Sequence, residues 1–236
     1  MEESALSLAN DEKRKKRKAL IGYYKFWVVL TYFSAVSAIA GMYFALSGNI
    51  VLAIICLMIC GLCDMLDGPV ARRKKRSERE KSFGIQIDSL ADLISFGIFP
   101  VVIGFAVDSE YLSQENVTFR LILFIVIATI YVLTALIRLA YFNVIEAEIQ
   151  GKREKRKYYE GMPVTMVSVL IPLVYSICLI LGFSIASIYP VMLLIISVAF
   201  ITKVKIPKIK NRYLLIFLLI GIPIAVYLIW SIGART

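Results

Sequence analysis

Four aspartates lie near one another in an otherwise apolar part of the sequence: Asp64, Asp67, Asp88 and Asp92. The members of each pair are three or four residues apart, so each pair would project from one face of a helix. An aspartate at the centre of a membrane helix costs about 2.5–3.5 kcal/mol on insertion scales, so four carboxylates in such surroundings require a compensating positive charge. The chain contains no histidine. We therefore predict that carboxylate oxygens bind divalent cations here, Mg²⁺ or Mn²⁺.

Three alternative roles for the four aspartates are compatible with their residue type. Ion pairs with the basic loop that follows Arg72 would balance the charge, although they would not explain the matched spacing of the two pairs. A cation transporter also binds ions with carboxylates, but such sites usually lie at the bilayer midplane, on broken helices of repeated halves. No internal repeat is visible in this chain. A lipid-binding scaffold without catalysis would tolerate loss of the aspartates.

Small residues and an arginine accompany the aspartates: Gly68, Ala71, Arg72 and Gly84. A glycine directly after Asp67 lets a ligand approach the backbone, and an arginine one turn further on can bind a phosphate. The same small residues would also serve helix packing in a membrane.

The surrounding sequence predicts an all-α integral membrane protein. Its hydrophobic content of 59% and mean hydropathy of +0.78 exclude an ordinary soluble domain. Seven apolar stretches approach the ~20 residues that a membrane helix needs, and they lack the alternation of a barrel strand. They lie near residues 26–46, 50–70, 85–107, 120–143, 162–182, 185–202 and 213–231.

The distribution of Lys and Arg predicts the orientation. Basic residues gather in segments 1–22, 72–83, 144–160 and 203–212, whereas the alternate loops 47–49, 108–119 and 183–184 have none. By the positive-inside rule, the N-terminus and the aspartates face the cytoplasm and the C-terminus lies outside. The basic run before the first stretch indicates contact with anionic membrane lipids rather than with nucleic acid.

The same pattern predicts three parts. Residues 1–20 form a basic cytoplasmic tail, residues 21–210 form the membrane domain, and residues 211–236 add a further C-terminal transmembrane helix.

The aspartate motif resembles the signature of a known family. Asp64-x-x-Asp67-Gly68-x-x-Ala71-Arg72, followed by Gly84-x-x-x-Asp88-x-x-x-Asp92, is similar to that of the CDP-alcohol phosphatidyltransferases. The resemblance spans roughly residues 20–210. The stretch between Arg72 and Gly84 is longer than in the general signature, which bears on loop contacts rather than on the metal site.

The resemblance implies a six-helix core, usually a homodimer, that binds two divalent cations and a CDP-linked lipid. The hydroxyl of an acceptor alcohol attacks the lipid-side phosphorus and CMP leaves. Carried over by position, Asp64, Asp67 and Asp88 would be metal ligands, and Asp92 would contact metal and accept the hydroxyl proton. The residues implied to contact the nucleotide are Asp67, Gly68, Ala71, Arg72 and Gly84.

Three further stretches are similar to the family members that use L-serine as acceptor and CDP-diacylglycerol as donor: residues 88–97, 138–143 and 161–165. Tyr141 departs from the arginine often found there. Glycerol 3-phosphate or inositol phosphate as acceptor, and CDP-archaeol as donor, remain alternatives. Arg138, a cation within an apolar helix, needs an anionic partner, which would be a serine carboxylate, a lipid phosphate or an aspartate. The candidate acceptor-binding residues are Ser95, Arg138 and Asn143, with Thr165 a similar candidate.

Overall fold

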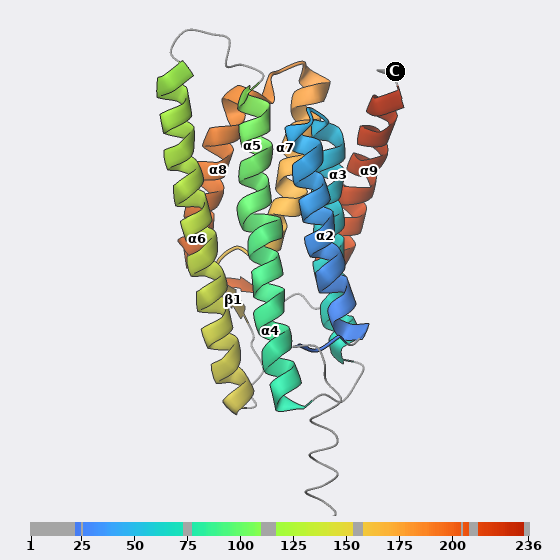
Figure 1. The fold of residues 1–236 in the computed structure, drawn as a ribbon, viewed down its shortest axis with the longest axis vertical. Coiled ribbons are helices and arrows are strands. Elements are labelled where there is room, and N and C mark those ends of the chain that lie inside the picture. The colour runs from blue at the N-terminus through green and yellow to red at the C-terminus, as the bar shows by residue number, and fades with distance from the viewer. Residues whose placement is uncertain are drawn as a thin grey trace, which may run out of the picture.

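The computed structural model describes residues 22–24, 26–72, 77–109, 117–152, 158–203, 205–207 and 212–233. Its helices lie side by side along the long axis of one bundle (Figure 1). Five of them are long and apolar enough to cross a membrane, namely Val28–Leu46, Ile50–Asp67, Glu78–Asp108, Thr118–Ile145 and Val164–Leu181. Two shorter apolar helices accompany them, Ile185–Ile201 and Leu219–Trp230. The predicted all-α membrane fold is confirmed.

Each predicted stretch corresponds to one helix or helical run. The α-helices are α2 (Phe26–Leu46), α3 (Ile50–Arg72), α4 (Glu78–Asp92), α5 (Phe99–Ser109), α6 (Val117–Lys152), α7 (Val167–Leu181), α8 (Ile185–Ile201) and α9 (Arg212–Gly233). A π-helical turn, η1 (Leu93–Ile98), joins α4 to α5, and a 3₁₀ turn, η2 (Val164–Met166), precedes α7. The sequence did not predict the short antiparallel pair of β1 (Tyr158–Glu160) and β2 (Lys205–Pro207).

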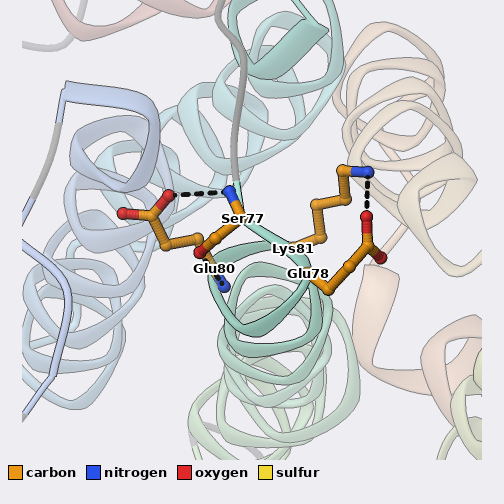
Figure 2. Close-up of polar contacts among 4 residues, drawn as sticks. All are labelled: Ser77, Glu78, Glu80 and Lys81. Atoms are coloured by element: carbon orange, nitrogen blue, oxygen red, sulfur yellow. Dashed lines mark hydrogen bonds and ion pairs between the residues drawn. The ribbon is translucent and has the colours of Figure 1, made fainter. Parts of the chain in front are cut away.

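The helix that carries Asp88 and Asp92 begins earlier than predicted, at Glu78 instead of residue 85. Ser77 caps its first turn: the Glu80 amide donates to Ser77 Oγ at 3.3 Å, and the Ser77 amide donates to Glu80 Oε2 at 3.0 Å (Figure 2). This reciprocal arrangement is a capping box, which satisfies two amides that a helix start leaves without partners. Hydropathy alone assigns these polar first turns to a loop, whereas the Ser-x-x-Glu pattern of residues 77–80 indicates the start of a helix.

Small side chains let the first helices approach closely. Ala38 and Ala45 of α2 are almost fully buried, and a Cβ added at Gly41 would overlap Phe99 and Cys56. Close backbone approach of this kind is a main source of helix association in membranes. As a result α2 packs along α3 and also contacts α4 and α5.

The two helices that carry the aspartates are held apart. Among the described elements, α3 packs on α2, α7 and α9, whereas α4 contacts α2 and α6, and the two make little direct contact with each other. Asp64 of α3 and Asp88 and Asp92 of α4 nevertheless come within reach of one another. Helix α9 rests on α3 and α7, with Leu228 fully buried, and ends at the opposite end of the bundle from the last turns of α3 (Figure 1).

Candidate metal centre

Three of the four aspartates converge between α3 and α4. One carboxylate oxygen from each of Asp64, Asp88 and Asp92 lies within 4.8 Å of the others, and all three side chains are partly buried. We call these three residues the aspartate cluster. Like charges about 4 Å apart repel by roughly 4 kcal/mol at the effective dielectric typical of a protein surface. The cluster therefore requires a cation to remain ionised.

The described cations do not supply that charge. Within the part of the chain that the structure describes, no Lys or Arg forms an ion pair with the aspartate cluster. Lys81 pairs instead with Glu78 at 2.7 Å (Figure 2). Three convergent carboxylates and no nitrogen ligand suit a hard divalent cation such as Mg²⁺ or Mn²⁺. The geometry thus fits the predicted metal, while residues 73–76 of the basic loop lie outside the described part.

The aspartate cluster opens into a cavity of about 350 Å³. Asp67 also lines this cavity, so all four predicted aspartates border one space. The other lining residues are Met65, Arg138, Leu139, Phe142, Pro163, Val164, Thr165 and Met166. The volume is typical of a site for a small ligand.

Arg138 connects α6 to the opposite wall of the cavity. Its Nε donates to the Met162 carbonyl at 3.0 Å, and an NH2 hydrogen donates to the Gly161 carbonyl at 3.2 Å. The side chain is 7% exposed. The segment that follows, residues 163–166, lines the cavity, and we call it the cavity wall. Arg138 therefore holds the turn that positions the cavity wall. The sequence did not predict that its partners are two backbone carbonyls.

Two other predicted acceptor-binding residues lie outside the cavity lining. Ser95 is fully buried, and its hydroxyl is 3.3 Å from that of Ser34. Asn143 Oδ1 accepts a hydrogen bond from Ser89 at 2.9 Å, which ties α6 to α4 beside Asp88. A direct contact of Ser95 or Asn143 with an acceptor stays a prediction.

The predicted nucleotide-binding residues are placed only in part. Gly84 lies in the second turn of α4, partly buried. Gly68, Ala71 and Arg72 belong to the last turns of α3, but their side chains lie outside the part that the structure describes. Their contact with a nucleotide stays a prediction.

Sequence reasoning missed several apolar residues of the cavity: Met65, Leu139, Phe142, Pro163 and Met166. Helical spacing could have identified two of them, because Phe142 lies four residues after Arg138 and three residues after Leu139, the spacings at which side chains are neighbours on a helix. The others are brought to the cavity by the packing of α7 and α3, for which the sequence carries no local signal.

Comparison with known proteins identifies the family of the chain. The sequence model of the family described as CDP-alcohol phosphatidyltransferase matches residues 28–203.

Individual relatives share parts of the chain. A CDP-diacylglycerol–serine O-phosphatidyltransferase of Saccharomyces cerevisiae is 37% identical over 124 residues, which cover 51% of this chain and 40% of that protein. An archaetidylserine synthase of Methanothermobacter thermautotrophicus is 28% identical over 185 residues, covering 78% and 70%. A CDP-diacylglycerol–serine O-phosphatidyltransferase of Mycobacterium leprae is 31% identical over 134 residues, covering 57% and 41%. The chain thus spans less than half of the yeast and mycobacterial relatives.

Proposed function

The chain belongs to the CDP-alcohol phosphatidyltransferase family, and on this premise we propose that it transfers the phosphatidyl group of CDP-diacylglycerol to the hydroxyl of L-serine. One observation carries the proposal: the aspartate cluster borders a cavity of small-ligand size within a bundle of apolar helices. Relatives named for the serine reaction support the choice of acceptor.

In this proposal the aspartates of the cavity have different roles in the transfer. Asp64, Asp67 and Asp88 would hold divalent cations, and Asp92 would contact metal and take the proton from the serine hydroxyl. The hydroxyl oxygen then forms a bond to the lipid-side phosphorus while the bond from that phosphorus to the CMP oxygen breaks. Bound cations would stabilise negative charge on the transferring group and on CMP. A carboxylate held by cations is a weak base, so close orientation of the hydroxyl must contribute much of the rate.

The cavity also has groups suited to the rest of the two substrates. Arg138 lines it, and a guanidinium is a planar, permanently charged group whose geometry matches a carboxylate. We propose that this guanidinium also binds the carboxylate of serine, and that Thr165 lies beside it. Gly68, Ala71, Arg72 and Gly84 are proposed to contact the cytidine diphosphate.

We also propose that the protein is a homodimer with its N-terminus and the aspartate cluster on the cytoplasmic side. The distribution of Lys and Arg supports this orientation. The far end of α9 then lies outside, in agreement with its place in the bundle (Figure 1).

The test is a transfer assay with purified protein. CDP-diacylglycerol is supplied with Mn²⁺ or Mg²⁺ and one of L-serine, glycerol 3-phosphate or inositol phosphate, and both CMP and the lipid product are measured. We expect CMP release that depends on serine and on the metal. Release with another acceptor and none with serine would refute the serine assignment. Metal-stimulated ion flux in liposomes without CMP release would favour a transporter.

A second donor has a specific observation in its favour. The relative named archaetidylserine synthase matches a larger share of both chains than the yeast and mycobacterial relatives do. CDP-archaeol is therefore the alternative donor, with the same acceptor. Comparing kcat/KM for the two donors at saturating serine distinguishes them.

A further inference from the structure

The helical run that carries Asp88 and Asp92 is not a regular α-helix. Directly after Asp92 the chain forms the π-helical turn η1, in which the Phe99 amide donates to the Ile94 carbonyl, five residues back. Pro100 follows and has no amide hydrogen. The carbonyl of Phe96, four residues before Pro100, therefore cannot receive the hydrogen bond that an α-helix would give it.

A tyrosine from another helix supplies the missing donor. The Tyr131 hydroxyl of α6 donates to the Phe96 carbonyl at 2.7 Å, and both residues are fully buried. A buried carbonyl left without a donor costs about 1–3 kcal/mol, so this bond stabilises the π-turn directly. On the other side of the turn, the Ser34 hydroxyl of α2 lies 3.3 Å from that of Ser95. The π-turn is thus held from α6 and from α2.

The π-turn sets the direction in which the aspartates face. An α-helix rotates by about 100° per residue, so one extra residue in a turn rotates the preceding helix by roughly that angle relative to the following one. Helix α5 is anchored in the core by Phe99 and Ile103, both fully buried. Because α5 is fixed, α4 is the helix that rotates, and its last two turns carry Asp88 and Asp92.

We propose that Tyr131 is a positioning residue for the metal centre. Its hydroxyl stabilises the π-turn, and the π-turn aims Asp88 and Asp92 at Asp64 across the gap between α4 and α3. This inference rests on the metal centre of the proposed function, but not on the identity of the acceptor or of the donor lipid. Outer partners that orient metal ligands typically contribute about 10–100-fold to metal affinity.

The test compares two tyrosines that make the same kind of bond. Tyr131→Phe removes the hydroxyl at the π-turn and keeps the ring. The matched control is Tyr189→Phe, because the Tyr189 hydroxyl donates to the Pro100 carbonyl, also at 2.7 Å, and is equally buried. That bond lies beyond the π-turn, on the α5 side. Mn²⁺ binding to detergent-solubilised full-length protein is followed by the electron paramagnetic resonance signal of the free ion, without substrates, and thermal unfolding is measured in parallel.

We expect Tyr131→Phe to bind Mn²⁺ at least about tenfold more weakly than the wild type, and Tyr189→Phe to keep wild-type affinity. Equal affinity of Tyr131→Phe and wild type would overturn the proposal, as would an equal loss in both variants, which would indicate general loosening. If Tyr131→Phe yields no folded protein, Ser34→Ala removes the hydroxyl that lies beside Ser95 of the π-turn, and must weaken Mn²⁺ binding in the same direction.

Two further results separate this inference from the proposed function. Mn²⁺ binding with the expected variant pattern, but no CMP release with serine, would refute the proposed function alone. A wild-type protein that binds no Mn²⁺ would overturn both.

Discussion

Replacing Gly161 by alanine should disturb the cavity wall without touching a metal ligand. Gly161 has a φ of +77°, in the left-handed region, and its carbonyl accepts from Arg138 at 3.2 Å. A Cβ at this position would lie 3.0 Å from the Thr202 carbonyl oxygen, 3.4 Å from that of Phe200 and 3.5 Å from Arg138 Cζ. Neighbouring atoms therefore already fill the space that the side chain of an alanine would occupy.

The chain offers a matched control in Gly48, in the turn between α2 and α3. Its φ is +81° and nothing lies within 4 Å of the position of a Cβ. Alanine at Gly48 should cost only the left-handed backbone penalty, about 1–2 kcal/mol. Alanine at Gly161 should cost that penalty plus about 1–2 kcal/mol for displacing a packed turn, together about 2–4 kcal/mol. The difference between the two variants measures the close contact alone.

The functional effect should differ more than the stability does. Displacing Gly161 moves the carbonyls that Arg138 binds and, with them, the cavity wall. A misplacement of about 1 Å can cost about 10²-fold in rate, so we expect kcat/KM for CMP release with serine to fall about 10- to 100-fold in Gly161→Ala. Gly48→Ala should retain wild-type kcat/KM at a temperature where both variants are folded.

The assay is CMP release at saturating Mn²⁺, with thermal unfolding in the same detergent to confirm that each variant is folded. Equal kcat/KM for Gly161→Ala and Gly48→Ala would refute the reasoning, because it would show that displacing the turn bound by Arg138 does not affect the substrate cavity. So would equal losses of stability, which would show that the contact with the Thr202 carbonyl relaxes freely.

Three other outcomes follow from the same site. Asp92→Asn should lower kcat for CMP release by about 10²-fold or more, since it removes the proposed proton acceptor; binding of CDP-diacylglycerol should remain measurable, and retained turnover would exclude Asp92 as the base. Chelation with EDTA should abolish CMP release, and Mn²⁺ or Mg²⁺ should restore it; activity that persists after chelation would contradict the metal centre. Arg138→Lys keeps the charge but cannot reach both carbonyls, so chemical denaturation should show a loss of about 1–3 kcal/mol, and unchanged stability would contradict the role of these bonds.

The sequence alone determined the membrane helices and the kind of chemistry. Seven apolar stretches, tested against the length of a bilayer crossing, became helices or helical runs, because backbone polar groups in lipid must be satisfied within each segment. Two of them extend well beyond the apolar stretch, α4 from Glu78 and α6 to Lys152. Spacings of three and four residues placed each aspartate pair on one helical face, because that periodicity is local. The capping box at Ser77 was equally local, and hydropathy alone overlooked it.

Only the tertiary structure decided which groups meet. It brought Asp64 together with Asp88 and Asp92 across helices that hardly touch, and it gave Arg138 backbone carbonyls as partners. The donor for the Phe96 carbonyl lies 35 residues further along the chain. Contacts at such separations depend on how whole helices pack and rotate, and no short-range periodicity encodes that rotation. The four aspartates could be recognised from their spacing, but the direction in which two of them face depends on a π-turn and a tyrosine from another helix.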